Sequence, residues 1–246
     1  MEKNYKMLLV YDGTRYFGWE RQKNTDMTIQ GKLEGVLERM TGKKIEVIGC
    51  SRTDAGVHAK GMTANVKLDV KQSPEEIRAY LNQYLPEDIC VKEITVASER
   101  FHSRYNASGK TYCYTCYIGK EKPVFDRKYV YAVDGRLDFS NMKKAAELLM
   151  GQHDFASFCA NKKMKKSTVR TIDKIELTTK NGYLYILVQG DGFLHHMVRI
   201  LVGTLLEVGW GKRTPESMTE LLAAKDRTKA GITVPAQGLC LMSVDY

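Results

Sequence analysis

Strand and helix patterns follow one another in the same order twice along this chain, and this repeat most constrains the fold. Short apolar runs rich in β-formers alternate with segments whose apolar residues recur at helical spacing. The first half has the order strand, helix, strand, strand, helix, strand, known as the split βαβ arrangement. The second half repeats this order with one extra helix. We therefore expect an α+β fold of two similar halves, each with a mainly antiparallel sheet and helices, and a cleft between them.

Turn and capping residues bound the expected elements, and the halves are expected to span residues 1–104 and 105–246. Ser73-Pro74-Glu75-Glu76 predicts a capped helix start, and Asn181-Gly182 predicts a hairpin turn. Strands are expected at 5–11, 45–49, 62–68, 88–96, 111–118, 170–179, 183–188 and 237–246. Helices are expected at 28–40, from 74 to just before Pro86, at 138–150, at 192–208 and from 214 onward.

The charge of the chain favours a polyanionic partner. The formal net charge is +9 and the pI is about 9.1. Lys and Arg side chains that contact phosphates release counterions and so favour nucleic-acid binding, although a charge that only aids solubility is the alternative. No apolar run reaches the roughly 18 residues of a membrane span, and the N-terminus does not resemble a signal peptide. We expect a soluble, cytoplasmic protein.

The sequence offers no pattern typical of a metal site. Cys113 and Cys116 fall on an expected strand, where their side chains point to opposite faces, and no second pair completes a zinc site. All six cysteines are expected to be reduced. His195 and His196 are expected on a helix, about 100° apart, without a further ligand nearby. We expect neither a metal nor a cofactor.

The loop from Ser51 to Ala59 gathers groups that can do chemistry. It lies between two expected strands and holds an arginine, a carboxylate, a glycine and an imidazole. Asp54 on such a loop can act as a nucleophile or a base. Arg52 is placed to hold a phosphate, and His58 either contacts phosphate or caps the loop. A plain polar turn is the alternative interpretation.

Arg199 is the other unusual residue. The segment 192–208 is apolar nearly all round, which predicts a buried helix, and Arg199 is the only charged residue between His196 and Glu207. A buried arginine is costly unless it meets a carboxylate or a phosphate. Any structural carboxylate satisfies this requirement. An Arg199–Asp54 pair across the cleft would in addition hold Asp54 ionised and oriented.

Six blocks of this chain, in order and over nearly its whole length, resemble the TruA family of tRNA pseudouridine synthases. They are Tyr11-Asp12-Gly13-Thr14 with Gly18-Trp19, Ser51 to Ala59, Lys110 to Tyr114, His153-Asp154-Phe155 with Ser157-Phe158, Phe193 to Arg199, and Gly238-Leu239 to Tyr246. The Arg-Thr-Asp-Ala-Gly-Val-His block is the most specific. One departure is Glu20, where a glutamine is expected.

The resemblance implies an isomerase that converts uridine to pseudouridine at positions 38 to 40 of the tRNA anticodon stem-loop, without a cofactor. It implies that Asp54 is the nucleophile, that Arg199 pairs with it, and that Tyr112 lies in the cleft, where it can stack on the flipped uracil. An inward-facing strand residue is the alternative for Tyr112. Lys110 is placed to contact phosphate, with loop solvation as its alternative. The resemblance also implies a homodimer that holds tRNA.

The sequence is also compatible with three other functions. An RNA-binding or tRNA-folding protein without catalysis would have no need of the intact Asp54, Tyr112 and Arg199. The same chemistry on ribosomal RNA is a further alternative. A nucleoside hydrolase would want a second carboxylate as acid, and no convincing partner for Asp54 is apparent. The lysine-rich run 161–166 modestly favours phosphate contact.

Overall fold

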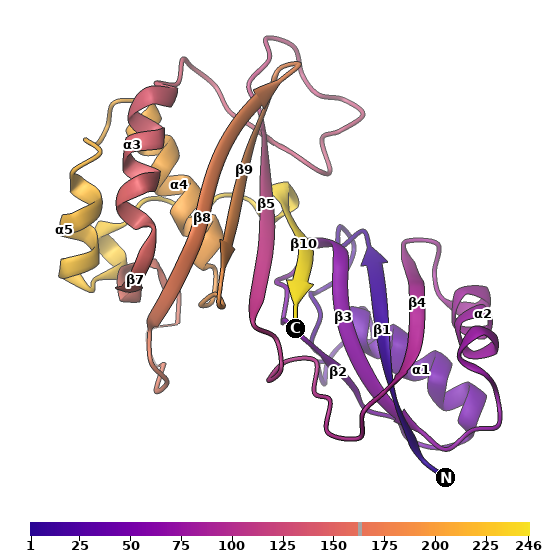
Figure 1. Cartoon of the computed structure of the whole chain (residues 1–246). Helices are drawn as coiled ribbons and strands as arrows, with labels where there is room; N and C mark the ends of the chain where they lie inside the picture. Colours follow the sequence, from indigo (N-terminus) through magenta and orange to yellow (C-terminus); the bar gives the residue numbers. More distant parts are fainter. Residues whose placement is uncertain (162–163) are drawn as a thin grey trace. The chain divides into compact units, whose positions relative to one another are not determined.

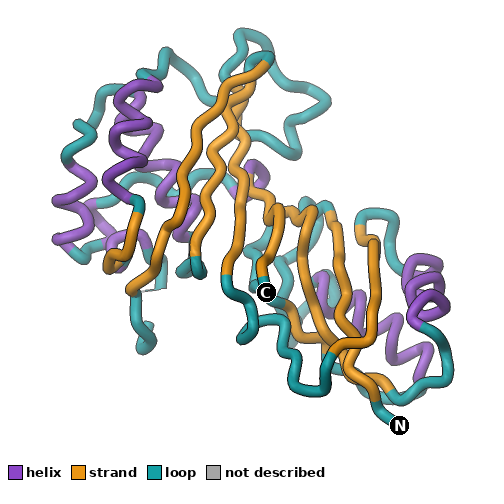
Figure 2. The backbone as a smooth tube through the Cα atoms, viewed as in Figure 1, coloured by secondary structure: helices purple, strands orange, loops and turns teal. Residues whose placement is uncertain are grey.

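In the computed structural model, which describes residues 1–161 and 164–246, the chain divides into two units. The first unit comprises Met1–Ser108 and Cys240–Tyr246, and the second comprises Gly109–Leu239. Both combine a sheet with helices, so the predicted α+β class is confirmed (Figures 1 and 2). We expected a boundary after residue 104 and the last strand in the second half. Residues 240–246 instead belong with the first unit, because β10 (Leu239–Asp245) pairs in parallel with β3.

The first unit has a sheet with two helices. Its strand order is β4–β1–β3–β10, and β2 pairs with β3. The strands are β1 (Lys3–Tyr11), β2 (Val47–Gly49), β3 (His58–Leu68) and β4 (Ile89–Ala97), and the helices are α1 (Ile29–Thr41) and α2 (Pro74–Tyr84). The predicted capping box of α2 is confirmed: Ser73 accepts from the Glu76 N–H, and the Glu76 carboxylate accepts from the Ser73 N–H.

The second unit repeats part of this strand arrangement. In the first unit, β3 lies between β2 and β1 and pairs antiparallel with both. In the second unit, β9 lies between β8 and β5 and likewise pairs antiparallel with both. The strands are β5 (Gly109–Tyr117), β6 (Tyr131–Ala132), β7 (Gly151–Asp154), β8 (Val169–Lys180) and β9 (Tyr183–Gly190). The α-helices are α3 (Phe139–Leu149), α4 (Met197–Gly209) and α5 (Ser217–Ala224), and the 3-10 turns are η1 (Ala156–Phe158), η2 (Arg227–Lys229) and η3 (Ala236–Gly238).

The predicted hairpin between β8 and β9 is confirmed, and its turn residues explain it. Asn181 and Gly182 both have positive φ, of 50° and 79°. Two-residue hairpin turns whose twist matches that of the strands require positive φ at both positions, which Asn-Gly adopts readily.

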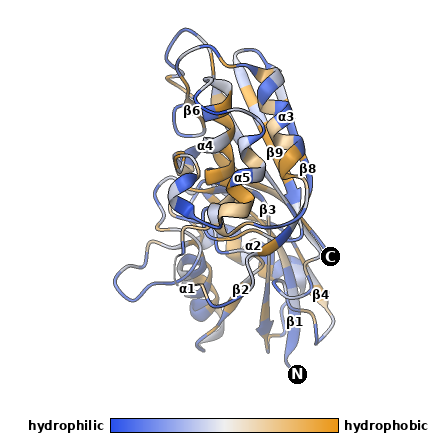
Figure 3. Ribbon diagram, turned by 90° about the vertical axis from the view of Figure 1, so that its left-hand side faces the viewer, coloured by the Kyte–Doolittle hydropathy of each residue, from blue (hydrophilic) through white to orange (hydrophobic). Residues whose placement is uncertain are grey.

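Helix α4 is buried nearly all round, as predicted, but it begins five residues later than predicted. Hydrophobic residues dominate its whole length (Figure 3). The prediction of a helix from residue 192 was wrong because His196 has a φ of 59°, in the left-handed region, which interrupts a right-handed helix. Residues 192–196 therefore form a turn that precedes the helix.

Two predictions from composition have structural counterparts. All six cysteines are free thiols, and Cys50, Cys116 and Cys159 are buried. Among residues 1–161 and 164–246, no helix combines the length and the apolar character that a membrane crossing requires.

Ser157→Ala tests the packing of α5 against η1. The Ser157 hydroxyl is fully buried, donates to the Leu221 carbonyl at 2.6 Å and accepts from the Asp226 N–H at 2.8 Å. Its removal takes a hydrogen-bond partner from the buried Leu221 and the half-buried Asp226, so we expect the free energy of unfolding to fall by about 1–3 kcal/mol in urea titrations. Ser140→Ala, at an exposed position of α3, is the control and should change it by less than about 0.5 kcal/mol. Equal effects of the two changes would contradict the expectation.

Candidate active site

The loop that carries Asp54 joins β2 to β3, and the segment that follows β1 holds it in place. The Trp19 N–H donates to the Thr53 carbonyl at 3.0 Å, and the Gly56 N–H donates to the Tyr16 carbonyl at 3.2 Å. Asp54, between these two anchors, is half-buried. Its carboxylate is thus carried by a loop whose backbone is fixed on both sides, which suits a nucleophile or a base.

Two glycines allow the segments to approach this closely. A Cβ at Gly18 would lie 2.6 Å from the Thr53 carbonyl oxygen, and a Cβ at Gly13 would lie 2.0 Å from the Val57 carbonyl oxygen. Gly18 also has a φ of 92°, a conformation that favours glycine. Gly13 and Gly18, both from the first sequence block, are therefore steric requirements of the Asp54 loop.

The aromatic cluster 16–19 has mainly a packing role. Tyr16 and Trp19 are buried, whereas Phe17 is 57% exposed. The Trp19 ring fills the space over Gly49, where a Cβ would lie 2.3 Å from it. The Tyr11 hydroxyl shares a hydrogen bond of 2.8 Å with Thr53 Oγ1, which adds a further anchor to the loop.

Arg52 is exposed on this loop, and Glu20 is its ion-pair partner at 3.1 Å. The unexpected glutamate thus lies next to the residue that we expected to hold phosphate. Arg104 is a third member of this charged group, and its pKa is lowered, first by burial and then by the charge of Arg52. Sequence reasoning missed Arg104, although the basic and aromatic composition of 101–110 was a signal for it.

His58 lies at the start of β3 and is buried. The Gly13 N–H donates to its Nδ1 at 3.0 Å, and a carboxylate oxygen of Asp12 lies 3.1 Å from the same nitrogen. A backbone N–H always carries its proton, so Nδ1 is the acceptor and the ring is not a cation paired with Asp12 in this arrangement. The imidazole holds the Asp12–Gly13 turn, and its contact with substrate stays a prediction.

In the second unit, Lys110 and Tyr112 lie on β5, opposite Gly190 and Val188 of β9. Tyr112 is buried and packs edge-to-face against Phe193, with ring centroids 5.4 Å apart. Lys110 is half-buried. The two predicted residues therefore lie on one strand, and Phe193, from the turn before α4, supports the ring of Tyr112.

Tyr114 is buried and, two residues along β5, lies on the same face as Tyr112 because strand side chains alternate between faces. Its hydroxyl donates to the Pro235 carbonyl at 2.7 Å. Burial raises the pKa of this phenol well above its usual range. Tyr114 therefore serves packing, which leaves Tyr112 as the candidate for chemistry on this strand.

Arg199 lies in the first turn of α4 and is half-buried, rather than fully buried as expected. Its Nε donates to the Val234 carbonyl at 2.8 Å, so one side of the guanidinium is fixed by the backbone. A guanidinium has further N–H groups for a carboxylate or a phosphate. The pairing of Arg199 with Asp54, which belongs to the other unit, stays a prediction.

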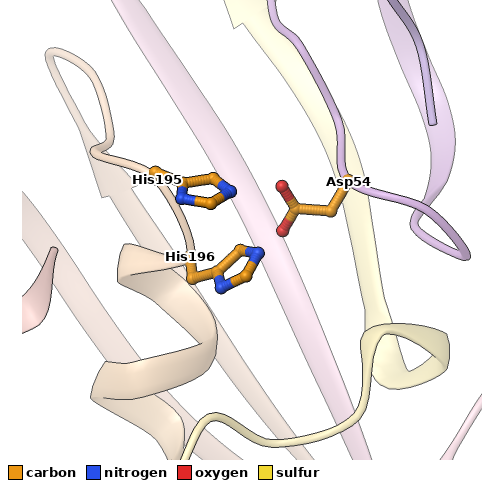
Figure 4. A group of neighbouring side chains, drawn as sticks. All are labelled: Asp54, His195 and His196. Atoms are coloured by element: carbon orange, nitrogen blue, oxygen red, sulfur yellow. The ribbon is translucent and has the colours of Figure 1, made fainter. Parts of the chain in front are cut away.

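Figure 4 draws the side chains of His195 and His196 in the turn before α4, and that of Asp54 on its loop. The two imidazole rings are neighbours, with centroids 3.8 Å apart and an interplanar angle of 35°. The prediction that they diverge on a helix was wrong, because both residues precede the helix.

The phosphate contact predicted for the lysine-rich run 161–166 stays a prediction, and Lys162 and Lys163 lie outside the described residues.

The sequence matches known proteins along nearly its entire length. A family model described as tRNA pseudouridine synthase matches residues 7–106 and 145–246. The tRNA pseudouridine synthase A of Bacillus sp. (strain KSM-64) is 49% identical over 243 residues, which make up 99% of each chain. The tRNA pseudouridine synthase A 1 of Clostridium tetani (strain Massachusetts / E88) is 48% identical over 244 residues, 99% of this chain and 100% of that protein.

Among solved structures, the archaeal box H/ACA sRNP Nop10-Cbf5 complex has a TM-score of 0.36 at 10% identity, over 82% of this chain and 44% of that chain. So low a score carries no argument about the fold.

The segments matched by the family model include Arg52, Asp54, His58 and Arg199, whereas residues 107–144 lie between the two matched segments. The roles expected of Lys110 and Tyr112 therefore have no support from that match.

Gly18→Ala tests the steric requirement of the Asp54 loop. The new Cβ would overlap the Thr53 carbonyl in a backbone conformation unfavourable to alanine, so we expect a loss of more than about 1 kcal/mol in the free energy of unfolding. Gly35→Ala is a matched control in α1, where a Cβ meets no atom within 4 Å. It should stabilise the protein by about 0.5–1 kcal/mol. Stabilisation by both changes, measured in urea, would show that the loop adapts freely.

Proposed function

The chain belongs to the tRNA pseudouridine synthase family, and on this premise we propose that it isomerises uridine to pseudouridine at positions 38 to 40 of the tRNA anticodon stem-loop. The observation that carries the proposal is identity of 49% with a tRNA pseudouridine synthase A over 99% of both chains. The net charge of +9 supports a polyanionic substrate. The general activity, an isomerase acting on tRNA, follows from the family, and the positions in the anticodon stem-loop are the finer part of the proposal.

The reaction breaks the bond between N1 of uracil and C1′ of ribose, turns the base and joins C5 to C1′. The C5 proton leaves and N1 gains a proton, so the atoms of substrate and product balance. A uridine in a stem must first leave its stack, at a cost of a few kcal/mol. In our proposal Asp54 is the nucleophile, and either C6 of the ring or C1′ is the atom that it attacks.

The other proposed roles support Asp54. Arg199 would keep the carboxylate ionised and oriented through a charged hydrogen bond, and its Nε bond to Val234 supports this role by holding the guanidinium in place. Tyr112 would stack on the flipped uracil and accept the C5 proton with its phenol oxygen. Its packing against Phe193 supports a fixed ring orientation.

Substrate contacts outside the reacting base belong to the basic residues. Arg52 and Lys110 would hold phosphates. Arg104, whose pKa is lowered by burial and by the charge of Arg52, would add a further positive charge beside Arg52. His58 would act through the Asp12–Gly13 turn and thereby through the loop. We further propose a cytoplasmic enzyme that works as a homodimer holding one tRNA, which sedimentation velocity with and without tRNA tests directly.

Asp54→Asn separates catalysis from binding. The amide has the same size but is a far weaker nucleophile, so we expect a folded protein that binds tRNA and forms no detectable pseudouridine. Chromatography of the nucleosides from digested tRNA measures the product, and fluorescence anisotropy measures binding. Asp26→Asn, at an exposed carboxylate paired with Lys32, is the control and should retain full activity. Turnover by Asp54→Asn would remove the nucleophile assignment.

Arg199→Ala tests the positioning role of the guanidinium. Without it, Asp54 loses its proposed partner, and we expect kcat to fall about 100-fold or more while tRNA binding changes little. Arg199→Lys keeps a charge but not the planar donors, so it should recover only part of the activity. Circular dichroism checks the fold of both variants. If Arg199→Ala unfolds, the residue has a structural role instead.

A further inference from the structure

The loop 118–130 leaves the sheet of the second unit at the end of β5 and returns to the same strand. Its two ends are held together by β6, which pairs Tyr131 with Cys116 and continues with a hydrogen bond of 2.8 Å from the Val133 N–H to the Tyr117 carbonyl. Figures 1 and 2 show it within the long connection between β5 and α3. A surface loop of this length whose ends are closed is an Ω-type loop, a class that is frequently functional.

Hydrogen bonds inside the loop order its outer part. The Asp126 carboxylate accepts from the Tyr183 hydroxyl of β9, and the Asp126 carbonyl accepts from the Tyr129 N–H at 2.8 Å. The hydrogen bond to Asp126 raises the pKa of Tyr183 to about 12. The Arg127 guanidinium donates to the Val124 carbonyl. The turn at 124–129 is therefore arranged before any partner arrives, which lowers the entropy cost of binding.

This ordered turn presents apolar side chains to water. Phe125 is 91% exposed, and Val124 and Tyr129 are 58% and 46% exposed. An aromatic ring in water forgoes the free energy that burial would provide, and contiguous exposed apolar side chains mark interaction sites. The arrangement thus favours a partner that covers Phe125.

The charges around Phe125 indicate which partner this is. The loop holds four basic residues against two acidic ones, and one of the acids, Asp126, is bound to Tyr183. The four basic side chains are all exposed: Lys120, Lys122, Arg127 and Lys128. A ring flanked by cations suits single-stranded RNA, where bases stack and phosphates are paired with lysine. A copy of the same loop would instead bring like charges together. The loop also lies outside the segments that the family model matches.

We propose that the loop 118–130 is an additional RNA-contact surface, in which Phe125 stacks on an unpaired tRNA base and Lys120 and Lys122 contact the adjacent phosphates. This inference rests on the proposed function, because it takes tRNA as the substrate. It assigns no catalytic role to the loop. Loss of the contact should therefore raise Kd and KM for tRNA and leave kcat unchanged.

Substitutions of Phe125 distinguish stacking from a merely apolar contact. Phe125→Leu keeps an apolar side chain but removes the ring, and we expect it to weaken tRNA binding between about 5-fold and 150-fold. Phe125→Trp keeps the π-face and should bind like the wild type. Its fluorescence, corrected for the two tryptophans already present, should be quenched when tRNA is added. Equal binding by the leucine variant and the wild type would overturn the proposal.

The lysines are tested through salt dependence. A double variant, Lys120→Gln with Lys122→Gln, should reduce the magnitude of the slope of log K against log salt by about 1–2, since each phosphate contact contributes about 0.7–0.9. Lys43→Gln with Lys44→Gln, at exposed positions in the first unit, is the control and should leave the slope unchanged. An unchanged slope in the first pair would contradict the phosphate contacts.

Two further readouts separate the possible failures. Sedimentation velocity of Phe125→Leu without RNA should match the wild type, and a change in oligomeric state would show that the ring contacts protein and would overturn the proposal. Wild-type pseudouridine formation is measured in parallel. If wild type forms none, the proposed function fails by itself. If wild type is active but Phe125→Leu has unchanged Kd and KM, only the loop inference fails.

Discussion

The close backbone contact between 13–19 and the loop 53–57 is the constraint on which the candidate site depends. Gly18 and Gly13 allow the approach, and hydrogen bonds from Trp19 and Gly56 fix it. This contact gives the half-buried Asp54 a fixed backbone. A rigid carrier for one carboxylate is what a covalent mechanism needs, because misplacement of the reacting atom by about 1 Å can reduce the rate about 100-fold.

Much of the fold was predictable because local signals and tertiary structure agree. The alternation of strand and helix patterns gave the α+β class, and the capping box at Ser73 and the Asn181-Gly182 turn marked element ends that the structure confirms. The predicted element boundaries were wrong where the local sequence pattern carries no signal. His196 adopts a left-handed φ inside an apolar run, so the start of α4 was misplaced. Strands such as β6, with two residues, are too short to produce a periodic pattern.

The site was predictable in its residue types more than in its contacts. Asp54 and Arg199 were conspicuous because one is a carboxylate on a strand-ending loop and the other a charge in an apolar segment. The sequence did not predict the ion pair between Arg52 and Glu20, because the two residues are distant in sequence. For the same reason it did not predict that the charge of Arg52 lowers the pKa of Arg104. The same holds for the ring of Phe193 against Tyr112. Residue roles in the reaction came from family resemblance, because no spacing rule distinguishes a nucleophile from a structural carboxylate.

Release of tritium from tRNA tests the central claim most directly, because C5 of uracil loses its hydrogen only when a new bond forms there. Unmodified tRNA transcripts labelled at C5 of uracil are incubated with the wild-type protein, without added metal or cofactor. We expect release to water, and we expect it to be lost when uridines 38 to 40 are replaced by cytidine. No release from a transcript that the protein binds tightly would contradict isomerisation of tRNA, and release unaffected by the replacement would contradict the proposed positions.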